Sequence, residues 1–328
     1  MKARTGSAAP GARRGAAAPP PQPKFFALIP PNPGIDFVRL APRMALLSTL
    51  IIVVGLVSVW TRGLNYGIDF TGGTVIEVRF AGPTSIADVR SALDHPELRS
   101  VSVQDVVGGR GNEFQVRAQQ REDEASSVAD VIKTALKERF GEGTFDILRV
   151  ETVGPKVGRD LWRNATFAVI AATVMMGIYI AIRFDLPVGV GAAAKLLHDV
   201  LFTLGAISLA GMEFDLSTVA ALLTVVGFSV NDNVIISDRI RESRKKNRRE
   251  SLATLVNLSI NETLSRTVIN SGTVVLTTTA LFVLGGPVIH SFAFALLVGF
   301  LIGTYSSIFV STPIVLALEE RRTKTTRR

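Results

Sequence analysis

The sequence predicts a polytopic α-helical membrane protein with six transmembrane helices and one α+β domain that lies outside the membrane between the first and second helices. The composition carries part of this prediction: 47% of the 328 residues are hydrophobic and only 20% are charged. The mean hydropathy of +0.34 agrees with it. Soluble proteins of this length have more charged residues and a lower mean hydropathy. The apolar residues are also gathered in long runs separated by charged segments, which is typical of membrane-spanning helices.

The first uncharged run, residues 44–60, is long enough to cross a bilayer as a helix. It follows a tail, residues 1–43, which we expect to be largely disordered because it is rich in Ala, Pro, Gly and Arg. After a long polar segment come five more apolar runs, at residues 165–182, 186–210, 217–236, 267–285 and 288–318. The ends of the third and sixth spans stay open, since the third contains charged residues and the sixth exceeds the length of one straight span.

The basic residues predict the orientation of these spans. Residues 1–43 carry seven basic and one acidic side chain, and the tail 319–328 carries five and two. Positively charged segments stay in the cytoplasm, and an even number of spans places both termini on one side. We therefore expect both termini in the cytoplasm and residues 61–164 outside, with residues 165–318 forming the second to sixth helices.

The outside segment, residues 61–164, alternates between strand and helix patterns. Strands are expected at residues 74–80, 101–107, 113–118 and 145–153, and helices at residues 84–93 and 122–140. The order β-α-β-β-α-β is that of a ferredoxin-like domain. The segment Gly108-Gly109-Arg110-Gly111 has the glycines of a phosphate loop but lacks the following helix and Lys-Ser/Thr pair, so we interpret it as a hairpin turn.

Several functional classes are disfavoured by the composition. The chain has no cysteine and only three histidines, which are far apart in sequence, so we expect no disulfide and no metal site. It also lacks a nucleotide-binding loop, a nucleophile elbow and a zinc-protease motif, so we expect neither an enzyme nor a bound cofactor. The basic residues are divided among several segments, which argues against a nucleic-acid partner.

Charged residues inside the apolar runs are the most informative feature of the sequence. Asp232 has apolar residues on both sides in the fourth run, and Arg266 opens the fifth. A carboxylate in a spanning helix costs about 2.5 to 3.5 kcal/mol, so it usually has a function. Consecutive antiparallel helices place Asp232 and Arg266 at similar depth, which predicts a charge pair that takes up and releases a proton, with Asn231 beside it on a water path. A static ion pair, or an Arg266 side chain that extends to the interface, is the structural alternative.

A second charged group lies in the third run. Lys195 and Asp199 are four residues apart, and His198 is next to Asp199. An intrahelical ion pair is the simpler interpretation of this spacing. A secondary proton relay through Lys195, His198 and Asp199 is the alternative.

Four motifs in order resemble the SecF family of protein-export membrane proteins, part of the SecD/SecF group in the resistance–nodulation–division superfamily. The first is Gly67-Ile68-Asp69-Phe70-Thr71-Gly72-Gly73, directly after the first span. The others are Leu197-His198-Asp199-Val200, then Gly227-Phe228-Ser229-Val230-Asn231-Asp232 with Ser237-Asp238-Arg239-Ile240-Arg241-Glu242, and Thr263-Leu264-Ser265-Arg266-Thr267 with Ser271-Gly272-Thr273. The resemblance covers residues 40–318. Phe228 and Val230 depart from the Tyr and Leu that are common in the family.

The resemblance implies a SecF-like subunit that pairs with a SecD-like subunit in the bacterial inner membrane, with residues 61–164 in the periplasm. It implies that the complex assists the SecYEG translocon and SecA, with YajC as a further partner, and uses the proton motive force to move a translocating polypeptide. The essential intramembrane Asp and Arg of the family fall on Asp232 and Arg266. The signature residues Gly67, Asp69, Phe70, Gly72 and Gly73 follow the first span, where Gly72-Gly73 is expected to be a hinge.

Two other functions stay open on the sequence. One is an exporter of small molecules or lipids from the same superfamily, although such chains usually have twelve spans and two large outside domains. The other is a scaffold that stabilises a membrane complex without moving protons. Substitution of Asp232 by Asn separates the scaffold from the proton carrier, because a scaffold tolerates a neutral side chain of the same size.

Overall fold

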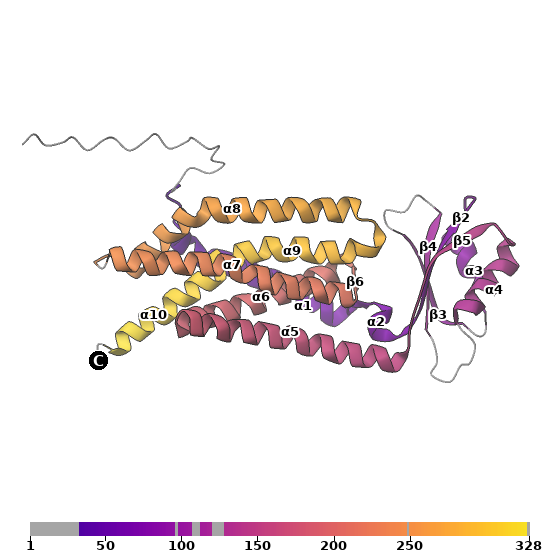
Figure 1. Ribbon diagram of the computed structural model, residues 1–328, viewed down its shortest axis with the longest axis horizontal. Helices are drawn as coiled ribbons and strands as arrows, with labels where there is room; N and C mark the ends of the chain where they lie inside the picture. The colour runs from indigo at the N-terminus through magenta and orange to yellow at the C-terminus, as the bar shows by residue number, and fades with distance from the viewer. Residues whose placement is uncertain (1–32, 96–97, 107–111, 120–127, 248, 327–328) are drawn as a thin grey trace, which may run out of the picture.

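The computed structural model describes residues 33–95, 98–106, 112–119, 128–247 and 249–326, and six of its helices are long and apolar enough to cross a membrane. Five of them are single helices: α1 Phe37–Arg62, α5 Pro155–Arg183, α6 Leu186–Ala210, α7 Leu216–Lys246 and α8 Leu252–Leu284. The sixth is built from α9 His290–Ser306, the π-helical segment η2 Ser307–Ser311 and α10 Thr312–Thr326, after a short 3₁₀ turn η1 Pro287–Ile289. The chain is a multi-pass membrane protein with a domain at one end of the helix bundle (Figure 1).

The helices extend beyond the apolar runs that predicted them. The first helix begins at Phe37, not at residue 44, because Asp36 caps it by accepting a hydrogen bond from the Arg39 backbone N–H at 3.1 Å. The second begins at Pro155, ten residues before the apolar run, and α10 continues through most of the basic tail 319–328. Hydropathy detects only the part of a helix that lies in hydrocarbon, while the polar turns at each end continue the same hydrogen-bond pattern.

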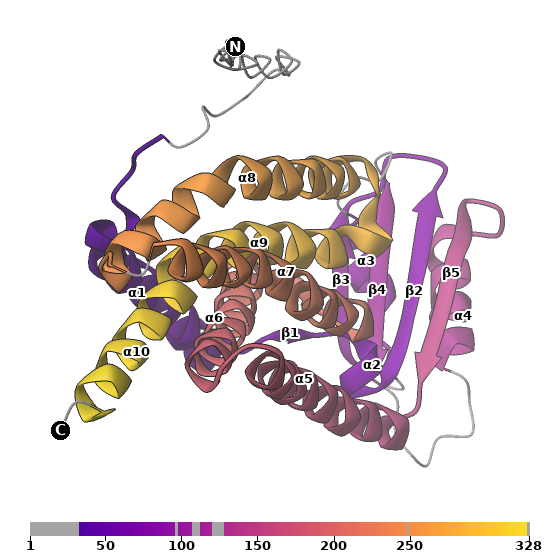
Figure 2. The ribbon, with the colours of Figure 1, turned by 60° about the vertical axis from the view of Figure 1, so that its left-hand side comes forward.

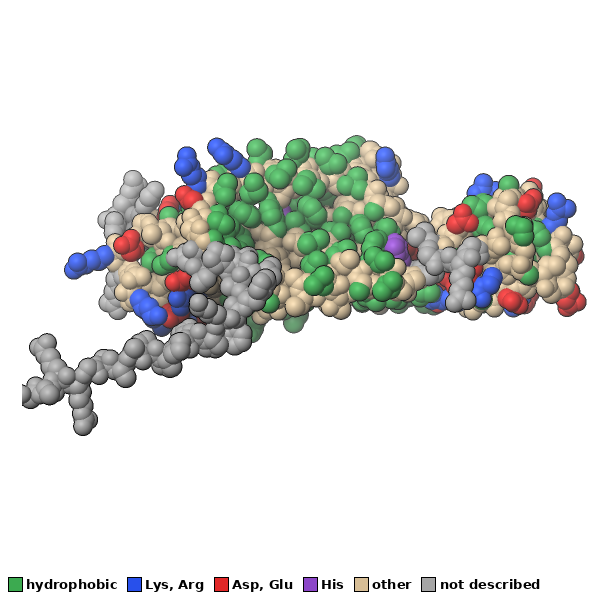
Figure 3. All heavy atoms as spheres, turned by 90° about the horizontal axis from the view of Figure 1, so that it is seen from above, with side chains coloured by type: hydrophobic (Ala, Val, Ile, Leu, Met, Phe, Trp, Pro, Cys, Tyr) green, Lys and Arg blue, Asp and Glu red, His purple; other side chains and the backbone are tan. Residues whose placement is uncertain are grey.

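The bundle has three inner and three outer helices. In the most apolar 18-residue stretch of each helix, about half of the residues are buried in α6, α7 and the last helix, against 17% in α1, α5 and α8. Close helix packing uses glycine: a Cβ at Gly55 of α1 would lie 2.7 Å from the Gly205 Cα of α6. Figure 2 shows α9 and α7 between α8 and α6. In the space-filling view the side of the bundle is largely hydrophobic, and charged side chains gather at its ends and on the domain (Figure 3).

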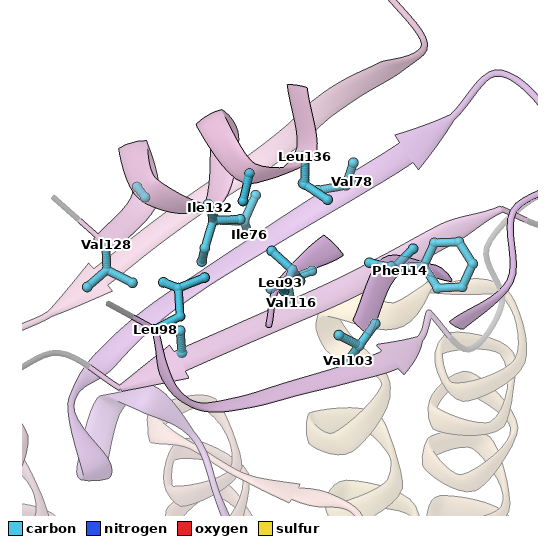
Figure 4. Packing of buried hydrophobic residues seen from close by; sticks show 14 of the residues in the cluster. Ile76, Val78, Leu93, Leu98, Val103, Phe114, Val116, Val128, Ile132 and Leu136 are labelled. Carbon is cyan, nitrogen blue, oxygen red and sulfur yellow. The ribbon is translucent and has the colours of Figure 1, made fainter. Parts of the chain in front are cut away.

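The domain between α1 and α5 has the predicted ferredoxin-like order. Its elements are β2 Gly73–Phe80, α3 Ile86–Ala92, β3 Arg99–Asp105, β4 Glu113–Gln119, α4 Val128–Phe140 and β5 Phe145–Val153. The strands form one antiparallel sheet in the order β3-β4-β2-β5. The helices α3 and α4 cover one face, on the side away from the bundle, where Ile76, Val116, Ile132 and Leu136 form the core (Figure 4). The other face of the sheet points toward the bundle.

Most elements of the domain lie close to the residues at which the sequence patterns predicted them. The strand expected at residues 145–153 is β5, and Ser85 caps α3 by accepting a hydrogen bond from the Asp88 backbone N–H at 3.1 Å. Of the helix expected at residues 122–140, the structure describes Val128–Phe140. The turn expected at residues 108–111 and residues 1–32 of the N-terminal tail 1–43 lie outside the described residues, while residues 37–43 of that tail belong to α1.

Candidate functional site

A fully buried ion pair lies in the middle of the bundle, on α6. Lys195 Nζ is 3.2 Å from Asp199 Oδ2, so the predicted pairing four residues apart is confirmed. Neither residue is exposed to solvent. The ammonium group also donates to the Ser229 backbone carbonyl on α7 at 2.8 Å and to the Ser229 hydroxyl, and that hydroxyl donates to Asp199 Oδ2 at 2.5 Å. The pair therefore crosses from α6 to α7 through Ser229, which the sequence analysis did not single out.

His198 extends this cluster on one side. Its Nδ1 lies 3.1 Å from Asp199 Oδ1, and its ring stacks on Phe202 at a centroid distance of 6.3 Å. Its Nε2 is buried without a protein hydrogen-bond partner. A buried imidazole nitrogen normally has a partner, so this atom points to a site that a water molecule or a proton can use.

Asp232 lies on α7 close to the same cluster and is 1% exposed. Its Oδ2 accepts a hydrogen bond from the Ser271 hydroxyl of α8 at 3.4 Å, and Ser271 in turn accepts one from the Thr304 hydroxyl at 2.6 Å. Its Oδ1 has no protein partner. The cation whose field acts on Asp232 is Lys195. Lys195 is therefore paired with Asp199 on its own helix, and its charge also acts on Asp232 of α7, although no ion pair joins Lys195 to Asp232 among the described residues.

The predicted pair between Asp232 and Arg266 is not formed in this structure. Arg266 is exposed on α8, and within the described part of the chain its side chain makes no ion pair. The side of α8 that faces inward carries Thr267 and Ser271, both buried. Arg266 precedes Thr267 by one residue, which turns it about 100° around the helix axis. The expected pair rested on the similar depth of Asp232 and Arg266 in the membrane, and depth does not determine the rotation of a helix about its axis.

The two asparagines beside Asp232 point in different directions. Asn231 is exposed and is not part of the buried cluster, and its expected place on a water path stays a prediction. Asn233 is 3% exposed, and its Oδ1 accepts a hydrogen bond from the Ser311 hydroxyl at 2.6 Å. Its Nδ2 has no protein partner. Ser311 ends the π-helical segment, and π-helical turns often occur at functional sites.

The signature residues 67–73 join the domain to the outer ends of the helices. Gly67 donates its N–H to the Phe214 carbonyl at 2.9 Å, next to a short parallel pairing of β1 Asn65–Tyr66 with β6 Glu213–Phe214. It also precedes the single turn α2 Ile68–Thr71. Asp69 of this turn accepts a hydrogen bond from the Leu216 N–H at 2.9 Å, at the start of α7, the helix that carries Asp232 and that Asp215 caps.

Phe70 and the two glycines fix how the signature segment packs. Phe70 is buried against Trp162 of α5 and against Phe214, at ring distances of 5.4 and 5.6 Å. Gly72 has a φ of 71°, and a Cβ there would lie 2.7 Å from the Pro155 Cα at the start of α5. The glycine is therefore required by its backbone conformation and by this close contact. Whether it is also a hinge stays a prediction.

An ion pair connects the domain to the bundle at this junction. Arg117 of β4 contacts Glu213 of β6 at 2.6 Å and donates to the Tyr66 carbonyl at 2.9 Å. Burial raises the pKa of Glu213, and the Arg117 charge opposes that rise without cancelling it. Asp69 and Asp215 add negative charge nearby. The pair has no local signal in the sequence, because its members belong to segments far apart in the chain.

The described residues contain no group of three or more His, Asp or Glu side chains that could hold a metal ion. What the site offers chemically is two buried carboxylates, one buried lysine that pairs with Asp199, and hydroxyl groups that hydrogen-bond to each carboxylate. Such a set suits storage and transfer of protons across a helix bundle.

Comparison with known families gives two matches. The family described as "Protein export membrane protein SecD/SecF, C-terminal" matches residues 120–321, and the family described as "SecD/SecF GG Motif" matches residues 57–84. The second match contains the signature segment described above.

Relatives and solved structures agree with these matches. "Protein translocase subunit SecF" of Magnetococcus marinus is 47% identical over 87% of this chain and 92% of its own length, and that of Desulfurispirillum indicum is 41% identical over 86% and 91%. The crystal structure of SecDF from Thermus thermophilus, described as a translocon-associated membrane protein, is 37% identical with a TM-score of 0.78. The match covers 89% of this chain but 40% of that longer one. SecDF in a super-membrane-facing form has a TM-score of 0.67 at 36% identity, over 96% and 42%.

Proposed function

The chain belongs to the SecD/SecF family of protein-export membrane proteins, and on that premise we propose that it is the SecF subunit of a SecD–SecF complex. The complex assists SecYEG- and SecA-dependent translocation of proteins across the inner membrane and draws on the proton motive force. The curated relatives that carry the SecF name match most of this chain, which supports the assignment.

The observation that carries the proton-driven part of this proposal is the burial of two carboxylates, Asp199 and Asp232, near one buried lysine that pairs with Asp199. Lys195 balances one negative charge, so Asp199 and Asp232 together leave one charge uncompensated when both are ionised. Uptake of one proton by Asp232 makes the cluster neutral, and its release restores the charge. Each protonation change therefore alters the attraction between α6 and α7, the two helices that hold the cluster.

A proton that crosses a membrane potential of about 100 mV supplies about 2.3 kcal/mol. This energy shifts a two-state equilibrium by more than about tenfold. The structure offers a route for this energy to reach the domain, because Asp69 of the signature segment accepts a hydrogen bond from Leu216 at the outer end of the helix that carries Asp232. A movement of α7 would then pull on the segment that tethers the domain.

The second subunit of the proposed complex is a SecD-like chain with six further spans. Arg266 supports this part of the proposal, because it is exposed on α8 where the apolar run of residues 267–285 begins. A charged side chain facing lipid at that depth is costly, so a protein surface covering α8 is favoured. The SecYEG translocon and YajC are further proposed partners, and the translocating polypeptide is the proposed substrate.

The proposed topology places both termini in the cytoplasm and the ferredoxin-like domain in the periplasm. The chain has no cysteine, so single cysteines report their side of the membrane without interference. Glu142→Cys in the domain should react with an impermeant thiol reagent in intact spheroplasts, whereas Lys246→Cys at the end of α7 should react only in inverted vesicles. The opposite pattern would contradict the proposed orientation.

Asp232→Asn tests the proton carrier. It retains the size of the side chain and removes its charge and titration, so gradient-dependent translocation into inverted vesicles should fall to the level without a gradient, while the complex still assembles. Asp238→Asn is the matched control, an exposed carboxylate on the same helix, and should leave translocation unchanged. If Asp232→Asn vesicles respond to the gradient as the parent does, the proton-carrier role is wrong and the protein is a scaffold.

A further inference from the structure

A groove of about 650 Å³ opens between α5 and α6 on the side of the bundle. At the end of α5 away from the domain the two helices pack closely. A Cβ at Gly177 would lie 2.9 Å from the Ala193 Cβ, and one at Gly189 would lie 2.7 Å from the Ala181 Cα. Small residues allow this close approach, so they fix where the groove ends. Toward the domain the groove opens, and residues of α7 line its floor.

The groove is almost entirely apolar and is about as deep as one leaflet of a bilayer. On α5 its wall runs from Trp162 to Val174, which is about 18 Å along the helix axis. The hydrocarbon core of a bilayer is about 30 Å thick, so one leaflet contributes about 15 Å. Ile170, Val174 and Leu197 in the walls are each more than half exposed. In a membrane these walls therefore face acyl chains.

The groove is too narrow to hold a further helix. Spread along about 18 Å, its volume corresponds to a mean cross-section of roughly 36 Å². An α-helix with its side chains is about 10–12 Å across, which requires more than twice this area. A single flexible acyl chain is therefore favoured over a helix of a partner protein.

Basic side chains lie at the outer end of the groove wall on α5. Lys156, Arg159 and Arg163 follow one another at spacings of three and four residues, so they share one face of the helix. Arg163 also precedes Ile170 by seven residues, which places it on the face that lines the groove. Asp160 is the only acidic side chain of α5. Since Lys156 and Arg163 are exposed, this end of the groove is cationic.

These cations lie at the depth of the lipid headgroups. Arg163 precedes the apolar run of residues 165–182 by two residues, and Trp162 beside it is of a type enriched at the membrane–water interface. The positive-inside rule does not account for the cations, because the proposed topology places this end of α5 outside. A negatively charged ligand at headgroup depth does account for them.

We propose that the groove binds an anionic phospholipid of the outer leaflet, with one acyl chain between α5 and α6 and its phosphate beside Lys156 and Arg163. The choice of leaflet rests on the proposed topology, whereas the lipid site itself does not depend on proton transfer. Each basic side chain near a membrane surface favours an anionic lipid by about fivefold, so the two together favour it over a zwitterionic lipid by more than about tenfold. The same side chains repel the positively charged end of a signal peptide.

The two tryptophans of the chain allow a direct measurement of the occupant. Trp162 lines the groove, whereas Trp60 of α1 does not line it and is 86% exposed. Trp60→Phe leaves Trp162 as the only tryptophan, and Trp162→Phe leaves Trp60 as the matched reporter of bulk lipid. The full chain is placed in phosphatidylcholine nanodiscs that contain a minor fraction of lipid brominated near the carbonyl end of its acyl chains, since bromine quenches tryptophan fluorescence on contact.

The brominated lipid is either phosphatidylglycerol, which is anionic, or phosphatidylcholine, which is zwitterionic. We expect the anionic lipid to quench Trp162 at least about threefold more than the zwitterionic lipid, whereas the two should differ by less than about twofold at Trp60. Lys156→Gln with Arg163→Gln should remove the preference at Trp162, and Arg183→Gln at the other end of α5 should retain it. Ala194→Phe fills the groove and should reduce the quenching of Trp162 by both lipids at least about twofold.

Two outcomes would overturn the lipid site. If both lipids quench Trp162 equally, the groove holds bulk lipid only. If neither lipid quenches Trp162 and an added hydrophobic signal peptide changes its emission instead, the groove takes polypeptide. Nanodiscs carry no gradient, so either failure leaves the proposed proton-driven function intact. A failure of the Asp232→Asn test likewise leaves the lipid site intact, and a reversed topology would change the leaflet but not the quenching.

Discussion

Replacement of Lys195 by Met is the sharpest test of the buried charge cluster. Lys195 is fully buried, its Nζ lies 3.2 Å from Asp199 Oδ2, and it is the cation that acts on Asp232. Methionine has a similar length and no charge. The variant therefore removes the ammonium group and leaves two carboxylates in the interior with no cation between them.

The expected loss follows from the burial of the pair. Removal of one partner of a buried ion pair typically costs about 3–5 kcal/mol, because the remaining charge is left without compensation. At about 2–4 °C per kcal/mol for a domain of comparable size, the unfolding midpoint should fall by roughly 10 °C. Lys137 provides the matched control: it pairs with Glu142 at 2.8 Å on the surface of the domain. Lys137→Met should cost less than about 1 kcal/mol, since exposed pairs contribute little.

The measurement is thermal unfolding of the purified chain in detergent, followed by loss of the monodisperse peak in size-exclusion chromatography. The double variant Lys195→Met with Asp199→Leu removes the pair together and should recover more than half of the loss, because apolar residues replace buried pairs at little cost. If Lys195→Met loses no more stability than Lys137→Met, or if the double variant loses the sum of its two single variants, the pair does not stabilise the bundle in the way inferred from its geometry.

Three further outcomes are expected. When the domain contacts the bundle, burial raises the pKa of Glu213, so this docked state binds a proton at Glu213 more tightly than the undocked state does. Spin-label distances should therefore show the domain held more firmly below the ordinary pKa of a glutamate and released as the pH rises through the raised pKa. Glu213→Gln should remove this pH dependence. Gly205→Val should lower the unfolding midpoint by several degrees, since a Cβ there would lie 2.8 Å from the Gly55 Cα, whereas Gly227→Ala, with nothing within 4 Å, should not. Arg266→Ala should change the midpoint of the isolated chain by less than about 2 °C but weaken co-purification with the second subunit, and an unchanged yield of the complex would contradict the proposed interface.

The fold was largely predictable because its signals are local in sequence. Apolar runs of about 20 residues identify spanning helices, since each helix satisfies its own backbone hydrogen bonds in lipid. The strand expected at residues 145–153 became β5, and Ser85 caps α3 within the helix expected at residues 84–93. Helix ends were less predictable: α1 begins at Phe37 and α5 at Pro155, because polar turns outside the hydrocarbon do not change the hydropathy pattern.

The candidate site was only partly predictable. Lys195 and Asp199 were paired correctly because both lie on one helix, where a spacing of four residues places side chains on one face. Asp232 contacts Ser271 of α8 in this structure and not Arg266, because the rotation of α8 about its axis turns Ser271 inward and Arg266 outward, so the proton pair of Asp232 and Arg266 stays a prediction. Ser229 had a signal in the sequence, because it precedes Asp232 by three residues and so shares its side of α7. That signal identifies a face but not the group that the face meets.

The sequence by itself determined the number of spans, the ferredoxin-like order of the domain and the depth of each buried charge. Only the tertiary structure decided the rotation of each helix about its axis and the contacts between elements far apart in the chain. The rotation turns Arg266 outward and Ser271 toward Asp232, and the long-range contacts bring Arg117 to Glu213 and Ser311 to Asn233. Depth follows from the rise of 1.5 Å per residue along one helix. Rotation follows from how all the helices pack together, which no single segment encodes.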